Sequence, residues 1–323
     1  MNILNLLSAM PGAVAQGLIW GIMAIGIYIT YRILDIADLT VDGSLCTGGA
    51  VCIMLMLSGQ NVFVAMLGAT IAGMATGLAT GIFHTFMGIP AILSGILTQL
   101  ALYSVNLKIM GKSNQAINVD KYDLLVSLRY IKGVAFYKNS IFVVAAAIVL
   151  LVLILYWFFG TEYGCGLRAT GCNGNMARAQ GINTDFAKVI GLMISNGLVG
   201  LSGALLSQYQ GFADINMGRG AIVIGLAAVI IGEAVFDKIF HNFGLKLIGV
   251  AFGSVLYYIV IQTVIWMGFD PDLLKLLSAL VVAVFLAIPY WKGKYFRKPA
   301  VKSTAEKSAT EQSVVEKGGS GNA

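Results

Sequence analysis

Long apolar runs separated by short polar segments dominate about the first 290 residues of the chain. A helix needs about 20 apolar residues to cross a bilayer. Two apolar runs, Leu45–Leu57 and Ala221–Val235, are too short to cross alone and predict half-spanning helices. The pattern therefore predicts an all-α polytopic membrane protein with about eight or nine transmembrane or half-spanning helices. The runs that predict full spans are 12–34, 61–86, 90–110, 139–160, 186–210, 244–267 and 272–291.

Composition supports a membrane setting and marks one end of the chain as different. Of the 323 residues, 58% are hydrophobic and only 11% are charged, whereas soluble domains carry about 25% charged residues. The 39 glycines suit helices that pack at close backbone distance in lipid. We expect a transmembrane domain over 1–298 and a disordered tail at 299–323, which is too polar to bury a core.

The two short runs have similar lead-ins. Ile36–Val41 reads IADLTV and precedes Gly43, and Phe212–Met217 reads FADINM and precedes Gly218. Each follows one long run and precedes two more, which predicts a repeat at about 12–110 and again at about 186–291. A linking loop (111–138) and one extra span (139–160) would invert the second repeat relative to the first, as in many transporters.

Paired short segments interrupted by glycine are the best sequence pointer to a translocation path. Acidic residues in such segments are functional candidates, but an Asp also caps the positive end of a short helix. Both roles stay open here, contact with a solute and orientation of the broken backbone. The candidates are Asp38, Thr40, Asp42, Gly43, Ser44, Asp214, Asn216 and Gly218. Polar positions in the long runs line a path or bond neighbouring helices: Gln99, Asn106, Asn196, Gln208 and Gln262.

A polar loop at 161–185 carries the pattern of a short amphipathic helix around Cys172–Ile182, closed by a C-terminal glycine. Met176 would be an adaptable apolar side chain for contact with a partner, and Arg178 would be a cation that pairs with acidic residues of that partner. Anchoring of this helix to anionic lipid is the alternative. The candidate contact residues are Arg168, Asn173, Asn175, Met176, Ala177, Arg178, Gly181 and Ile182. Glu233, after the second short run, either pairs with Arg168 or Arg178 as a relay or is a solvated helix end.

Basic residues set the expected orientation. If the 161–185 loop and the tail lie in the cytoplasm, the larger share of the 21 Lys and Arg residues lies inside, as the positive-inside rule requires. Because many of these residues lie in the tail, the net charge of +6 does not indicate binding of nucleic acid.

The sequence shows no constellation for catalysis, metal binding or cofactor binding. His84 and His241 are the only histidines and lie far apart, so neither a metal nor a nucleophile site is expected. Gly111-Lys112-Ser113 imitates the end of a phosphate-binding loop, but Asn106 stands where its first glycine belongs. The chain is therefore not expected to be an enzyme, and ATP hydrolysis, if it drives transport, takes place on another chain.

Three stretches carry a family resemblance. LRATGCNGNMARAQGIN at Leu167–Asn183 and GLAAVIIGE at Gly225–Glu233 resemble the permease subunits of bacterial ABC importers, the group with the branched-chain amino acid and ribose permeases. DIADLTVDGS at Asp35–Ser44 is similar to the tryptophan/tyrosine-type uptake branch.

The resemblance implies a multi-pass protein of the bacterial cell membrane that takes up a small solute, such as an aromatic amino acid. It also implies a second permease copy, two separate ATPase subunits that contact the 172–182 helix, and an extracytoplasmic solute-binding protein or lipoprotein. A self-contained, ion-coupled secondary transporter that uses Asp38 and Asp214 remains the alternative.

Overall fold

The computed structural model describes residues 3–119, 121–122, 124–128, 139–236 and 242–268, with a few positions between 273 and 287. Residues 1–285 form one compact unit, to which all the described features below belong. The predicted tail at 299–323 and most of the predicted span at 272–291 lie outside the described residues.

The protein is an all-α polytopic membrane protein, as the hydropathy pattern predicts. Six described helices are long and apolar enough to cross a membrane, and they match six of the seven predicted full spans. In chain order the elements are α1 (Ile3–Tyr28), the π-helix η1 (Ile29–Ile33), α2 (Val41–Leu57), α3 (Val62–Thr85), α4 (Ala91–Met110), β1 (Asn114–Ala116), α5 (Ser140–Gly160), α6 (Glu162–Cys172), α7 (Gly174–Ala179), α8 (Thr184–Gln210), β2 (Phe212–Asp214), α9 (Ala221–Phe236) and α10 (Phe243–Trp266).

The helices pack in pairs that mirror one another. α8 packs along α3, and α1 packs along α10. The short helix α2 lies on α3 and α8, and the short helix α9 lies on α10 and α1. If α1, α2 and α3 correspond to α8, α9 and α10, each of these contacts has its counterpart. The packing thus supports a repeat of α1–α3 in α8–α10, while the inverted orientation of the second copy stays a prediction.

Glycines let the short helix α2 approach its neighbours at backbone distance. A Cβ added at Gly48 of α2 would collide with the carbonyl of Gly200 in α8, and one at Gly203 would collide with the carbonyl of Leu45. Small residues at such crossings permit close van der Waals packing where lipid offers no hydrophobic driving force. The α2–α8 contact therefore depends on these glycines.

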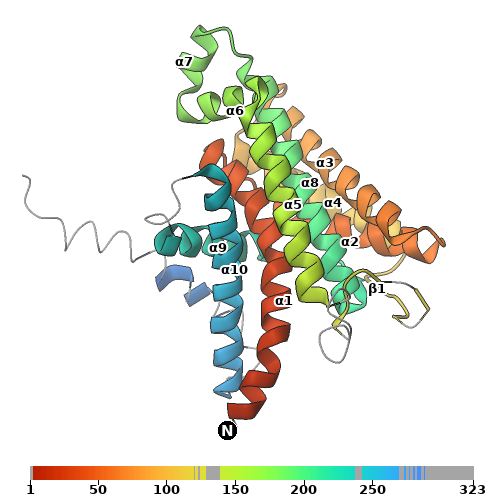
Figure 1. Ribbon diagram of the computed structural model, residues 1–323. Helices are drawn as coiled ribbons and strands as arrows, with labels where there is room; N and C mark the ends of the chain where they lie inside the picture. The colour runs from red at the N-terminus through yellow and green to blue at the C-terminus, as the bar shows by residue number, and fades with distance from the viewer. Residues whose placement is uncertain are drawn as a thin grey trace, which may run out of the picture. The chain divides into compact units, whose positions relative to one another are not determined.

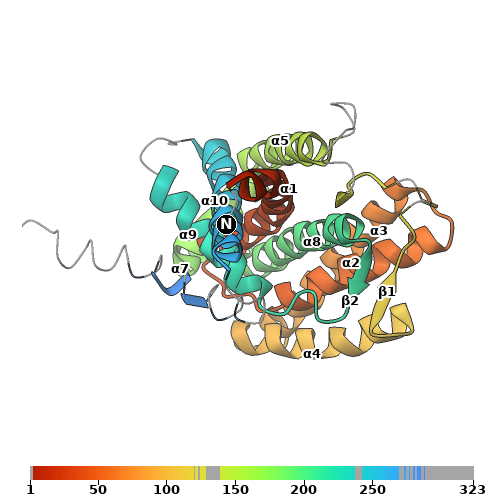
Figure 2. The ribbon, with the colours of Figure 1, turned by 90° about the horizontal axis from the view of Figure 1, so that it is seen from below.

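α4 and α5 lie on opposite sides of the helix bundle (Figure 2) and differ in mean hydropathy. In each helix, 28% of the most apolar 18-residue stretch is buried, but the mean hydropathy of that stretch is 3.0 in α5 and 1.3 in α4. An exposed face as apolar as that of α5 suits lipid. The lower value of α4 comes from its buried face, which carries Ser94, Thr98 and Asn106. Its exposed face is apolar too and includes Ile92, Leu93, Ile96, Leu97 and Leu100, so it suits lipid or an apolar surface of a neighbouring protein.

The two ends of the helices carry different structures (Figure 1). α6 and α7 lie at one end, where α5 finishes and α8 begins. Toward the other end, β1 pairs antiparallel with β2, with Asn114 opposite Asp214 and Ala116 opposite Phe212. This short sheet joins the segments that follow α4 and α8.

Candidate functional site

The helices α6 and α7, residues 162–179, form a surface that we call the platform. Asn173 caps the N-terminus of α7, because its Oδ1 accepts a hydrogen bond from the Met176 amide at 3.1 Å. Gly181, two residues after the end of the helix, has φ at +83°. The amides of Gly181 and Ile182 donate to the carbonyls of Arg178 and Ala177, as in a Schellman motif. The observed helix, Gly174–Ala179, is shorter than predicted, and α6 replaces what we expected to be loop.

Residues of α7 separate into outward-facing and inward-facing positions. Met176 is 62% exposed and Ala177 is 3% exposed, while Asn173, Asn175 and Gly181 are exposed as well. Arg178 is exposed too, but its Nη2 donates to Thr184 Oγ1 at 2.9 Å. This bond holds α7 to the first turn of α8, so Met176 is the more independent contact candidate of the two.

Arg168 does not face outward with Met176. Its guanidinium carbon lies 4.3 Å from the ring centre of Phe243 and 5.4 Å from that of Phe159. Its Nε is buried and has no hydrogen-bond partner within the described part of the chain. Cation–π contacts of this kind attach α6 to α5 and α10. The placement favours a positioning role for Arg168 over the expected contact with a partner.

The platform rests directly on the π-helix η1. A Cβ added at Gly171 of α6 would collide with the carbonyl of Ile33, the last residue of η1. One at Gly191 of α8 would collide with the side chain of Leu34. Asp35 follows with φ at 55°. Short π-helical segments inside longer helices are frequent at functional sites, and this one marks where the first span breaks.

Glu233 pairs with a residue that the sequence did not single out. Its Oε1 lies 2.9 Å from the Nε of Arg32 in η1, with the two side chains 28% and 61% exposed. The predicted pairing with Arg168 or Arg178 is therefore wrong, because Arg168 stacks on aromatic rings and Arg178 bonds to α8. The ion pair connects η1 to the last part of α9.

The segment between η1 and α2 is held by a buried polar network. Asp38 Oδ1 accepts from the Thr40 amide at 2.9 Å, and its Oδ2 accepts from Asn196 Nδ2 at 2.6 Å. Asn196 Oδ1 in turn accepts from Ser44 Oγ at 2.6 Å, and Ser44 Oγ lies 2.7 Å from Thr76 Oγ1. The network joins the start of α2 to α8 and α3.

A second branch of the network reaches α4. Thr40 Oγ1 lies 2.6 Å from Thr80 Oγ1, which donates to Thr98 Oγ1 at 2.9 Å. Asp38, Thr40 and Ser44 are all at most 3% exposed, so the structure supports orientation of the broken backbone rather than direct contact with a solute. Thr76, Thr80 and Thr98 were missed from the sequence, where the spacing of Thr76 and Thr80 on one helix face was the available signal.

Asp42 of α2, in the first predicted repeat, bonds to the start of α9, in the second. Its Oδ2 accepts from the Gly220 amide at 2.9 Å and its Oδ1 from the Ile222 amide at 3.0 Å, so it caps the N-terminus of α9 from the N-terminus of α2. A Cβ at Gly218 would collide with the Asp42 carbonyl. The N-termini of the two short helices therefore meet. Gly43 packs against Leu102 in α4.

Asp214 forms the same local turn as Asp38. Its Oδ1 accepts from the Asn216 amide at 2.7 Å, two residues on, as Asp38 Oδ1 accepts from the Thr40 amide. Its Oδ2 also accepts from Asn114 Nδ2 at 3.2 Å. The shared turn gives structural support to the proposed match between the two lead-ins.

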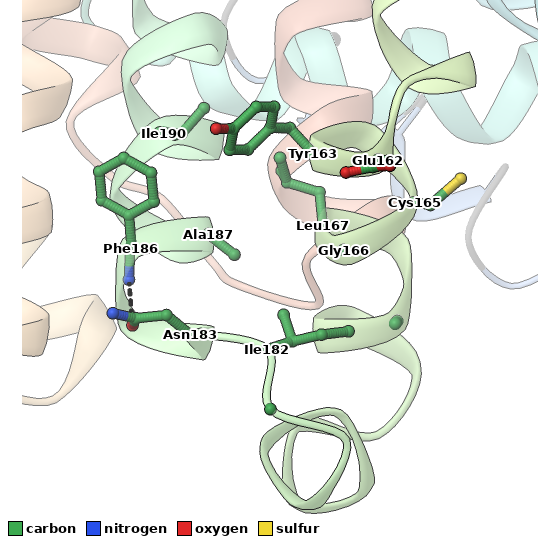
Figure 3. A pocket seen from close by; sticks show the side chains of 12 residues that line it. Glu162, Tyr163, Cys165, Gly166, Leu167, Ile182, Asn183, Phe186, Ala187 and Ile190 are labelled. Carbon is green, nitrogen blue, oxygen red and sulfur yellow. Dashed lines mark hydrogen bonds between the residues drawn. The ribbon is translucent and has the colours of Figure 1, made fainter.

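Two cavities lie beside these elements. One, of about 660 Å³, is enclosed by α6, the α7–α8 turn and the start of α8 (Figure 3). Tyr163, Leu167, Ile182 and Phe186 line it, and Asn183 caps α8 beside it by accepting from the Phe186 amide at 3.1 Å. The other, of about 270 Å³, lies between α2, α4 and the β2–α9 turn. Within the described residues, no cluster of His, Cys, Asp or Glu could hold a metal ion.

Comparisons with known proteins agree on the family. The model of the branched-chain amino acid transport system permease component matches residues 10–288. A tyrosine transport system permease protein of Clostridioides difficile (strain R20291) is 39% identical over 282 residues, 87% of this chain and 91% of that protein. An autoinducer 2 import system permease protein of Yersinia pseudotuberculosis (serotype O:3, strain YPIII) is 27% identical, over 55% of this chain and 49% of that protein.

The fold is also found among solved structures. The chain of PsaBC from Streptococcus pneumoniae in complex with Fab aligns with a TM-score of 0.53 at 15% identity, covering 91% of this chain and 98% of that one. Since the family model covers most of the chain, this protein belongs to the family of branched-chain amino acid transport system permease components and is a permease of an ABC-type transport system.

Proposed function

We propose that this chain is the translocation subunit of an ATP-driven importer in a bacterial cell membrane. Two ATPase subunits bind the platform from the cytoplasm, and an extracytoplasmic binding protein delivers the solute to the opposite end. The path runs between two copies of this chain.

The observation that carries this proposal is the route from the platform to both short helices. Gly171 of α6 lies on the backbone of η1. From η1 the chain runs through the Asp38 network into α2, and the Arg32–Glu233 ion pair leads to α9. A force on α7 would therefore reach the two half-spanning helices whose N-termini meet, and moving these helices would switch access to the path.

The small solute that we propose is an amino acid, such as an aromatic one. The relative from Clostridioides difficile is named for tyrosine transport and covers nearly the whole chain. In an importer fed by a binding protein, selectivity rests largely on that protein, so the path itself needs only a few contacts with the solute.

Replacing Met176 tests the docking surface. Burying a methionine contributes about 1.5–3 kcal/mol, and 1.4 kcal/mol is tenfold in affinity. We expect Met176→Ser to weaken binding of the ATPase subunits tenfold or more and to lower uptake by reconstituted vesicles. Met87→Ser is the matched control, because Met87 is 60% exposed, against 62% for Met176, and lies in the α3–α4 turn.

Equal ATPase affinity in Met176→Ser and Met87→Ser would overturn the assignment of the platform. Solute accumulation by the purified chain without any ATPase, driven by an ion gradient, would overturn the importer itself. That result would instead support an ion-coupled secondary transporter.

A further inference from the structure

The 270 Å³ cavity between α2, α4 and the β2–α9 turn contains polar groups that the fold leaves unused. Asn106 of α4 is only 1% exposed and lines this cavity. Its Oδ1 is a buried acceptor that has no hydrogen-bond partner among the residues that the structure describes. A buried acceptor left unpaired costs about 1–3 kcal/mol, so a donor from a ligand would be bound favourably there.

Opposite charges face the same cavity. Asp42 lines it, and although its two oxygens cap α9, a carboxylate has about four lone-pair sites and can accept further bonds. Arg219, in the turn before α9, also lines the cavity and is exposed. Among the described residues the Arg219 side chain makes neither an ion pair nor a hydrogen bond. One free cation and two acceptors thus share one small space.

The position of the cavity suits a solute in transit. It lies where the positive N-termini of α2 and α9 meet, and half-helix N-termini bind anionic groups of substrates in other transporters. Leu100 and Tyr103 of α4 line its open side and are 65% and 46% exposed. The cavity therefore opens onto the exposed face of α4. Its volume is close to the lower limit of about 300 Å³ for ligand pockets, which suits a small molecule.

We propose that this cavity is a contact site for zwitterionic amino acids in the translocation path, an inference that rests on the proposed importer function. The α-carboxylate binds Arg219, and the α-ammonium donates to Asn106 Oδ1 and Asp42. The side chain of the amino acid lies against Leu100 and Tyr103. Asp38, Thr40 and Ser44 hold α2 in place from behind and do not touch the solute.

The test uses the assembled transporter, with both ATPase subunits and its binding protein, in vesicles. The vesicles are supplied in turn with radiolabelled L-tyrosine, a labelled amino acid mixture and labelled uncharged sugars. We expect Arg219→Gln and Asn106→Leu each to lower the maximal uptake rate at least tenfold. ATP hydrolysis stimulated by the binding protein should stay within twofold of the unmodified protein, and Arg219→Lys should recover much of the uptake. Lys112→Gln is the control, since Lys112 is an exposed cation that does not line the cavity.

The outcomes separate the site from the function. If the unmodified transporter takes up amino acids and both variants match it, the cavity is not a contact site. If stimulated ATP hydrolysis falls together with uptake, Arg219 serves docking of the binding protein or folding, and the site assignment fails. If the unmodified transporter takes up uncharged sugars but no amino acids, the zwitterion proposal fails while the importer stands. Absence of any ATP-dependent uptake would overturn the proposed function itself.

Discussion

Replacing Asn196 with alanine should lower the melting temperature of the purified protein by about 4–12 °C. The buried amide of Asn196 bonds Asp38 and Ser44, each at 2.6 Å. Hydrogen bonds contribute about 1.5–3 kcal/mol to a charged group and about 0.5–1.5 kcal/mol otherwise, but those between membrane helices average about 0.6 kcal/mol. We therefore expect the loss of both hydrogen bonds to lower the free energy of unfolding by about 2–3 kcal/mol. A melting temperature moves by about 2–4 °C per kcal/mol in a chain of 150–250 residues, and we apply that ratio here.

The protein carries its own reporters for this measurement. Cys46 and Cys52 of α2 are buried free thiols, whereas Cys165 and Cys172 are exposed. A thiol-reactive fluorophore would label the exposed pair at once, and its later signal would follow the release of α2 from α8 on heating. Because Cys52 and Cys46 lie on the helix that Asn196 anchors, the reporter is local to the network.

Ser207→Ala is the matched control for Asn196→Ala. Ser207 lies on the same helix and is equally buried, at 0% exposed, but its hydroxyl donates within α8, to the Ala204 carbonyl at 2.9 Å. We expect this variant to melt within about 2 °C of the unmodified protein. Melting of Asn196→Ala at the same temperature as Ser207→Ala would show that the network does not stabilise α2.

Two further predictions concern the Arg32–Glu233 ion pair and the turn between α7 and α8. Arg32→Glu and Glu233→Arg should each lower uptake severalfold, since an exposed ion pair contributes up to about 1 kcal/mol. The double exchange should restore uptake, because it re-forms the ion pair with the charges reversed. A double variant that transports no better than either single variant would contradict the coupling role of the Arg32–Glu233 pair. Gly181→Ala should speed proteolysis of the α7–α8 turn severalfold, because a left-handed conformation costs an L-residue about 1–2 kcal/mol. Gly174→Ala is the control and should leave the proteolysis rate unchanged, because a Cβ at Gly174 meets no other atom and its φ is not positive. Equal cleavage of the two variants would contradict the expected backbone strain at residue 181.

The sequence by itself determined the features that depend on neighbouring residues. Mean hydropathy over about 20 positions gave the long spans, because the thickness of the bilayer sets their length. The two short runs, the repeated lead-ins around Asp38 and Asp214, and the helix closed by Gly181 are likewise local patterns. Each could be read because the physical cause lies within a few residues of its effect.

Only the tertiary structure decided which distant residues meet. Glu233 pairs with Arg32 rather than with Arg168 or Arg178. Asp42 caps a helix that begins about 180 residues later, and Arg168, which has the pattern of a docking residue, stacks on Phe243. Such pairings depend on which helix faces meet, and in an apolar chain many faces are nearly equivalent in hydropathy. The close glycine crossings of α2, α3 and α8 select one arrangement, because shape rather than polarity distinguishes the faces inside a membrane.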